Sequence, residues 1–183
     1  MRFEPFRFPL RDGRVCELRP PVEEDGEEML AWLRGVVTET PYLLRTPEEA
    51  ARLTVEAEKR FLMGVADSPG SLMAVAVVDG EIVGNCQVDF CGAQKQRHLC
   101  SVAIALSKKC WGNGLGTRML TFLLDTARAR EGVKKCELEF IGGNDRARAL
   151  YEKLGFRVVG VRPGAICQGD GSLVDLYLMQ CEL

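Results

Sequence analysis

Three glycines at alternate positions, Gly112, Gly114 and Gly116, precede an apolar pattern that is typical of a helix. The first N–H groups of a helix have no internal partner and lie at the positive end of the helix dipole, so such a turn attracts phosphate. The stretch does not match a P-loop, because Thr117 stands where that loop needs a lysine. It does not match the dinucleotide fingerprint either, since Thr117 again occupies the third glycine position. The glycines alone leave a phosphate-binding turn and a plain turn equally open.

A second group of polar residues lies in the stretch "NDRARALYEKLGF", where Asn144 and Tyr151 are seven residues apart. At 3.6 residues per turn they lie on nearly the same face of a helix. An asparagine that caps a helix can offer its amide to a ligand, and a tyrosine hydroxyl can donate a proton. Helix capping and a core aromatic would explain the same spacing.

The rest of the chain predicts the elements that position these residues. Strands are expected at 14–19, on either side of Asp79-Gly80 within 71–90, and at 97–106, 134–140, 156–163 and 172–183. Helices are expected at 22–37, at 46–67 with Thr46 as cap, from Leu115 to Gly132, and from Asn144 to Gly155. This order predicts a mixed α/β sheet in which antiparallel hairpins come first and a strand–helix–strand crossover follows.

Composition indicates one domain over residues 1–183, with 1–12 as an N-terminal extension. A net charge of −2 gives no general affinity for nucleic acid or for acidic membranes. The eight cysteines include no Cys-x-x-Cys pair and the chain has one histidine, so no metal site is expected. The N-terminus has no secretory pattern, and no apolar run is long enough to span a membrane. We expect a reduced, cytoplasmic protein.

Taken together, "CWGNGLGTRML" and "NDRARALYEKLGF" resemble the GCN5-related N-acetyltransferases (GNAT family). The first stretch is similar to the acyl-CoA pyrophosphate loop, Gln/Arg-x-x-Gly-x-Gly/Ala, and the second to a later signature with an asparagine and a tyrosine. The resemblance runs from "CELRPP" to the C-terminus. It implies a mixed, mostly antiparallel sheet flanked by helices, the acyl-CoA N-acyltransferase fold, and acetyl-CoA as acyl donor.

The resemblance also implies roles for single residues. It assigns the pyrophosphate to backbone amides of Gly112, Asn113, Gly114, Leu115, Gly116 and Thr117, and the pantetheine arm to the backbone of Ile104, Ala105 and Leu106. In the family this strand carries a bulge and splays from the next strand, which opens a slot for the arm. Asn144 would contact the cofactor, and Tyr151 would lie near the sulfur and protonate the departing thiolate.

Two positions depart from the family pattern. Trp111 stands where relatives have Gln or Arg, which puts one polar contact of the loop in doubt. Ser101 stands where many relatives have a glutamate that acts as general base. A water chain or another carboxylate must then take the proton, and the candidates in the sequence are Glu39 and Asp175.

Other nucleophiles and bases near this strand are weaker candidates. A covalent route through Cys100 or Cys110 lacks a histidine at a base position. His98 lies at the far end of the strand and is read as structural.

The expected reaction is direct transfer of an acetyl group from acetyl-CoA to a primary amine, with Tyr151 as general acid and a backbone N–H near Leu106 as oxyanion donor. The alternatives are a non-catalytic acyl-CoA-binding module and a structural domain. Residues 36–45 are expected to shape the acceptor pocket, with Tyr42, Leu43 and Leu44 as an apolar wall. The acceptor would be a small-molecule or peptide amine, and a homodimer is open because the apolar start "FEPFRFPL" could cover a sheet edge or a partner.

Overall fold

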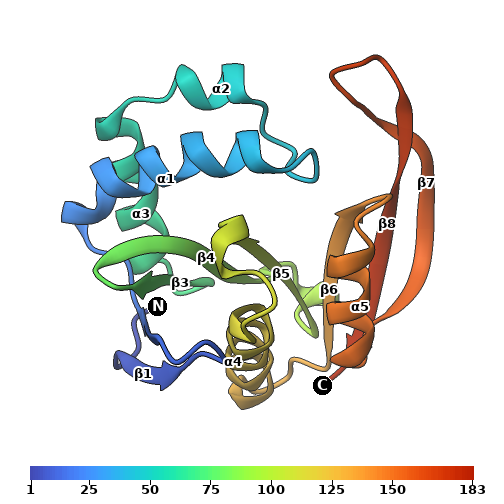
Figure 1. The fold of residues 1–183 in the computed structure, drawn as a ribbon. Coiled ribbons are helices and arrows are strands. Elements are labelled where there is room, and N and C mark those ends of the chain that lie inside the picture. Colours follow the sequence, from blue (N-terminus) through green and yellow to red (C-terminus); the bar gives the residue numbers. More distant parts are fainter.

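The computed structural model describes residues 1–183, which fold around one eight-stranded sheet (Figure 1). In spatial order the strands are β1 (Phe6–Pro9), β2 (Val15–Arg19), β3 (Ser71–Val78), β4 (Glu81–Phe90), β5 (Leu99–Leu106), β6 (Lys135–Ile141), β8 (Leu173–Glu182) and β7 (Arg157–Cys167). Every neighbouring pair is antiparallel except β5 and β6. The predicted mixed, mostly antiparallel sheet is confirmed.

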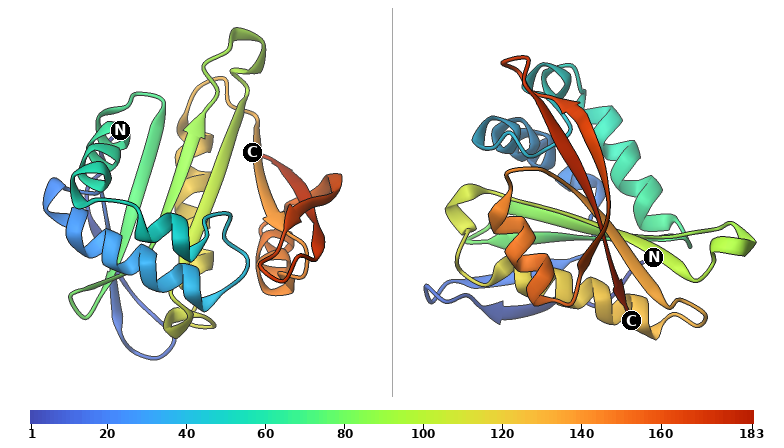
Figure 2. Two further views of the ribbon diagram at one scale, coloured as in Figure 1. Left: turned by 90° about the horizontal axis from the view of Figure 1, so that it is seen from above. Right: turned by 90° about the vertical axis from the view of Figure 1, so that its right-hand side faces the viewer.

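Helices cover both faces of this sheet. They are α1 (Gly26–Glu39), α2 (Pro47–Ala51), α3 (Val55–Asp67), α4 (Leu115–Ala129) and α5 (Asp145–Lys153). The first three lie on one side of the central strands, and α4 lies on the other (Figures 1 and 2). None of these helices combines the length and the apolar character that a membrane crossing requires.

The single helix expected at 46–67 is wrong, because the chain forms two helices there. Thr46 and Glu49 make the predicted capping box, with Pro47 at the first helical position. However, Thr54 adopts an extended backbone and its hydroxyl accepts from the amide of Ala57. A second cap of this kind ends one helix and starts the next, since the cap residue itself lies outside helical dihedrals.

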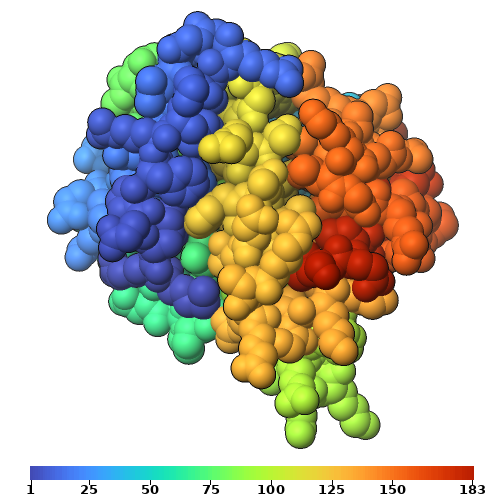
Figure 3. Space-filling model, turned by 90° about the horizontal axis from the view of Figure 1, so that it is seen from below, coloured from blue at the N-terminus to red at the C-terminus, as the bar shows by residue number.

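The sequence reading missed β1. Its residues alternate, and Phe8 is buried while Arg7 is exposed and paired with Glu17. The strand pairs with β2 at the edge of the sheet, and the preceding Phe3 packs on Phe122 of α4 with ring centroids 4.7 Å apart. Figure 3 shows this N-terminal segment lying along α4. The apolar start therefore covers a sheet edge.

The predicted crossover and splay are both present between β5 and β6. The two strands are parallel and joined by α4, yet they pair only from Leu99–Lys135 to Ser101–Glu137. Beyond this point they diverge, as Figure 1 shows. The bulge expected in β5 is wrong: its pairing with β4 keeps one register throughout. The shift lies one strand away, where β3 pairs with β4 next to Ala76.

Two apolar cores fix the orientation of β5 and β6. On one face Cys100, Val102, Cys136 and Leu138 pack in the core that includes α4. On the other face Ala105 packs against the smaller core formed by α1, α3, β3 and β4. Side chains alternate along a strand, so Ser101, Ala103 and Glu137 face the α1 side. Four leucines of α4 are almost fully buried, at Leu115, Leu120, Leu123 and Leu124, and each contributes roughly 1.5–3 kcal/mol.

Candidate active site

The glycine-rich turn joins β5 to α4, and its glycines are required for two different reasons. Gly112 and Gly114 have φ values of 81° and 85°, a region that side chains rarely adopt. Gly116 lies in the first turn of α4, where a Cβ would come within 3.1 Å of Leu150 and 3.3 Å of Leu106. The amides of the first turn have no acceptor inside the helix. The turn therefore combines a tight backbone with free N–H groups at a helix N-terminus.

A cleft of about 1030 Å³ opens where β5 and β6 part. It brings together nearly all the residues expected to bind the cofactor, namely Ile104, Ala105, Leu106, Gly112, Gly114, Leu115, Gly116, Thr117, Asn144 and Tyr151. Asn113 is the exception and lines an adjoining cavity of about 240 Å³ instead. Residues up to 47 positions apart in the sequence thus meet in one cavity, which is the geometry expected from the two motifs.

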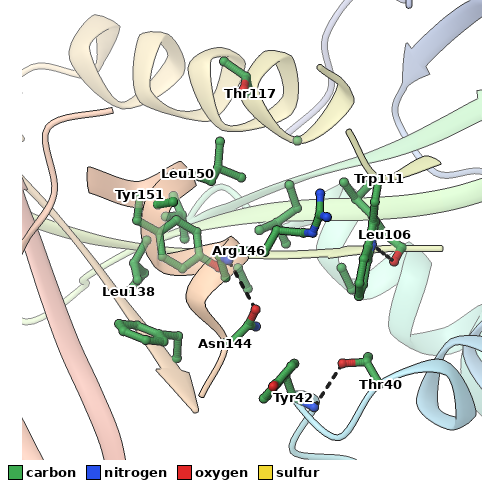
Figure 4. Close-up of a pocket in the computed structure, with 18 of the residues that line it drawn as sticks. Thr40, Tyr42, Leu106, Trp111, Thr117, Leu138, Asn144, Arg146, Leu150 and Tyr151 are labelled. Carbon is green, nitrogen blue, oxygen red and sulfur yellow. Dashed lines mark hydrogen bonds between the residues drawn. The ribbon is translucent and has the colours of Figure 1, made fainter. Parts of the chain in front are cut away.

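Trp111 fixes the end of β5. Its Nε1 donates to the carbonyl of Leu106 at 3.1 Å, so the side chain ties the loop to the strand that precedes it. The Arg146 guanidinium lies 5.3 Å from the centroid of the ring, within cation–π range. Figure 4 shows Arg146 reaching across the cleft from α5 towards Trp111. The indole therefore supplies a structural contact where relatives are expected to have a polar side chain.

Asn144 caps α5 as predicted. Its Oδ1 accepts from the amide of Ala147 at 3.2 Å, and the side chain lines the cleft (Figure 4). One side chain thus satisfies an orphan N–H of the helix and keeps two donors for another group.

Tyr151 lies about two turns further along α5 and is buried, with 8% of its surface exposed. Its ring packs against Phe140 and Phe156 at centroid distances of 6.0 and 6.2 Å. Burial raises the pKa of the hydroxyl to about 12, because the tyrosinate would be poorly solvated. The hydroxyl therefore keeps its proton at neutral pH, as a general acid must.

Basic residues that the sequence reading missed surround the glycine-rich turn. Arg11 is held at the turn by its backbone amide, which donates to the carbonyl of Asn113 at 3.2 Å. Arg118 and Lys153 line the adjoining cavity with it. No local signal could have placed Arg11 here, because its position depends on the pairing of β1 and β2 at the sheet edge.

The α1 side of the cleft contains the predicted apolar wall of Tyr42, Leu43 and Leu44. The Tyr42 hydroxyl donates to the carbonyl of Gly143 at 2.8 Å, so this loop is tied to the segment before α5. Figure 4 shows Tyr42 on the opposite side of the cleft from Thr117. The loop and α5 thus close the cleft between them.

The carboxylates suggested by the sequence as bases lie elsewhere. Glu39 accepts from the backbone amide of Lys108 at 2.6 Å, and Asp175 accepts from the amide of Gly164 at 2.9 Å. Neither lines the cleft, and neither does His98. The acidic residues that do line it are Glu137 and Glu139 on β6, which the sequence reading missed. The sequence "KKCELEF" could have indicated them, because its glutamates alternate with the buried positions of the strand.

The two thiols considered as nucleophiles, Cys100 and Cys110, are both buried, and Cys100 does not line the cleft. All eight cysteines are free, and Cys110 is buried although it lines the cleft. Burial raises the pKa of its thiol above the ordinary value, which disfavours the reactive thiolate.

Comparison with known proteins agrees with this geometry. Residues 24–156 match the acetyltransferase (GNAT) family. The chain is 25% identical to the L-amino acid N-acetyltransferase AaaT of Escherichia coli over 115 residues, which are 63% of this chain and 70% of that protein. An acetyltransferase of the GNAT family from Streptococcus pneumoniae superposes with a TM-score of 0.84 at 27% identity, covering 92% of this chain and 99% of that one.

A structure from Salmonella typhimurium, solved with its cofactor acetyl-CoA, has the same fold, with a TM-score of 0.76 at 20% identity over 91% of this chain and 92% of that one. The match to the family covers most of the sequence, so the chain belongs to the acetyltransferase (GNAT) family. It is an acyltransferase, and its acyl donor is acetyl-CoA.

Proposed function

We propose that this protein transfers the acetyl group of acetyl-CoA directly to a primary amine, with Tyr151 as general acid. The observation that carries the proposal is one cleft that joins a glycine-rich helix N-terminus, the parting point of two parallel strands, and a buried tyrosine. None of these features is specific to acyl transfer when taken alone. Their presence in one cavity matches the shape and charge of a thioester that has phosphate at one end.

The proposed donor position follows from the polar groups of the cleft. The amides of residues 112–117 would hold the pyrophosphate, because they combine free N–H groups with the positive end of α4. The backbone of Ile104, Ala105 and Leu106 would pair with the pantetheine arm where β6 has turned away. The spare amide of Asn144 would contact the arm from α5.

The proposed chemistry needs little from the protein beyond position and charge. A backbone N–H near Leu106 would stabilise the oxyanion of the tetrahedral intermediate. Tyr151 would protonate the thiolate as it leaves, since its raised pKa keeps the proton available. The buried Cys110, whose pKa is raised, supports direct transfer over an acyl-cysteine intermediate.

The proposed acceptor is a small or peptidic primary amine. The cleft reaches the α1 side, where an apolar wall around Tyr42 and the carboxylates of β6 line the same cavity. That pairing favours a cationic amine with an apolar neighbour. The AaaT relative is named for L-amino acids, which makes amino acids the first acceptors to try. A cytoplasmic location and a homodimer stay predictions.

A panel of primary amines, amino acids and short peptides with acetyl-CoA, analysed by mass spectrometry, tests the proposal. We expect an acetylated product for at least one acceptor. Released CoA should be followed by chromatography, because eight protein thiols would react with a thiol dye. Binding of acetyl-CoA without any acetylated amine would instead support a non-catalytic acyl-CoA-binding module.

A further inference from the structure

Direct transfer to an ammonium group requires a base, and the cleft offers only two carboxylates. Among all the residues that line it, Glu137 and Glu139 are the acidic ones. Ser101 occupies the position at which many relatives have a glutamate as general base. Ser101 and Glu137 are partners in the last pair of the β5–β6 ladder. Neighbouring strands lie about 4.8 Å apart, so the carboxylate is one strand away from the serine.

Glu137 faces the side of the cleft from which an amine would enter. The preceding pair, Cys100 and Cys136, is buried in the core beneath α4. Because successive side chains alternate, Ser101 and Glu137 project to the opposite face, the side of α1 and of the loop around Tyr42. Tyr151 packs on Phe140 in the core beneath α4 and α5. Glu137 and Tyr151 therefore approach the cleft from opposite faces of the sheet.

The two carboxylates of β6 differ in their partners. Glu139 is engaged by the guanidinium of Arg162 at 2.5 Å, so its carboxylate already has a charged partner. Glu137 accepts one hydrogen bond, at 2.8 Å from the neutral amide of Gln180. The amide oxygen of Gln180 in turn accepts from Lys135 at 3.3 Å. Glu137 is thus oriented by a neutral group and keeps lone pairs for a proton.

We propose that Glu137 is the general base of the transfer and takes a proton from the acceptor ammonium, directly or through one water. This inference rests on the proposed function. The nitrogen lone pair then bonds to the carbonyl carbon, and the carbon–sulfur bond breaks with its electron pair on sulfur. Tyr151 gives its proton to that sulfur and regains one from the nitrogen as the amide forms. The proton on Glu137 is released to solvent, so one ammonium and one thioester give one amide, one thiol and one free proton.

The first variant to test is Glu137→Gln, an isostere that retains a partner for Gln180. With the best acceptor of the panel, we expect kcat to fall on the order of 10²–10⁴-fold near neutral pH, while the Kd for acetyl-CoA and the melting temperature stay close to wild type. The wild-type to variant ratio of kcat should fall as the pH rises, because an amine that is already neutral needs no base. Glu139→Gln is the matched control and should lose far less.

A rescue variant separates chemistry from structure. Adding Ser101→Glu to Glu137→Gln returns a carboxylate to the neighbouring position of the same ladder pair, and we expect it to restore part of kcat. A Glu137→Gln protein with wild-type kcat and pH dependence would overturn the inference while leaving the proposed function intact, as would an equal loss in Glu139→Gln. A wild-type protein that binds acetyl-CoA but acetylates no amine would overturn both.

Discussion

The cleft has two sides that are built differently. The donor side, which we define as residues 104–117 with Asn144 and Tyr151, consists largely of backbone groups from one continuous segment. The acceptor side, defined as residues 40–44 with Ser101 and Glu137, consists of side chains from three separate segments. In the proposed assignment, the donor side would tolerate most changes of side chain along residues 104–117, whereas the acceptor side would change its partner through single substitutions.

The largest expected effect is on the donor side. Gly114→Glu forces a side chain into a φ of 85° and adds a negative charge where the pyrophosphate would lie. We expect the affinity for acetyl-CoA to fall by on the order of 100-fold or more, which isothermal titration calorimetry would measure. Gly92→Glu is the control, because that exposed glycine has open space around its Cβ position. Equal binding by the two variants would contradict the loop assignment.

Tyr151→Phe should separate chemistry from binding on the same side. We expect kcat to fall on the order of 10²-fold or more, with little change in the Kd for acetyl-CoA. Burial raises the pKa of Tyr151 to about 12, so the acid form should persist in the wild type across the whole neutral and mildly alkaline range. Tyr177→Phe, which alters a ring stacked on Phe140 outside the cleft, should have wild-type turnover. Unchanged turnover in Tyr151→Phe would remove its role as acid.

Arg11→Ala tests whether a side chain contributes to phosphate binding at the glycine-rich turn, where the other proposed contacts are backbone amides. The guanidinium is exposed beside Gly112 and Gly114, so its attraction to phosphate is screened and should contribute only about 1 kcal/mol. We expect the KM for acetyl-CoA to rise roughly five-fold at low salt and less at high salt. Arg7→Ala on β1 removes a similar charge that is paired with Glu17, and its KM should not change. A salt-independent effect would point to a structural role for Arg11.

Tyr42→Phe should give the smallest effect, and it belongs to the acceptor side. The change removes the hydrogen bond from the Tyr42 hydroxyl to Gly143, worth about 1 kcal/mol, and loosens the loop that lines the cleft. We expect the KM for the acceptor to rise roughly five-fold or less, with no change in the affinity for acetyl-CoA. An effect on acetyl-CoA and none on the acceptor would contradict the division between the two sides.

The same division explains what the sequence could predict. The donor side comes from contiguous motifs, so the glycine-rich turn, the cap at Asn144 and the position of Tyr151 in the cleft were all predicted by spacing and resemblance. The acceptor side depends on register between strands. Glu137 reaches the cleft because β5 and β6 pair as far as Ser101 and no further, and no local pattern encodes that endpoint.

The errors in the fold prediction have identifiable physical causes. The strand β1 is four residues long and forms only because β2 offers an unpaired edge. The break between α2 and α3 depends on the cap at Thr54, which competes with an otherwise continuous helical pattern. The bulge was carried over from the resemblance, whereas the chain keeps one register along β5 and shifts next to Ala76 instead. The errors at β1 and at the bulge concern pairing between strands, whereas the error at Thr54 concerns a cap within one segment.

Direct passage of the acetyl group from the donor side to the acceptor side is the central claim, and a single-turnover experiment tests it most directly. The protein would be mixed with acetyl-CoA that carries an isotopically labelled acetyl group, and intact-protein mass spectrometry would follow the label before and after addition of the acceptor. We predict that the label appears on the amine and never on the protein. A labelled protein that loses its acetyl group when the amine is added would contradict the claim and indicate a covalent intermediate.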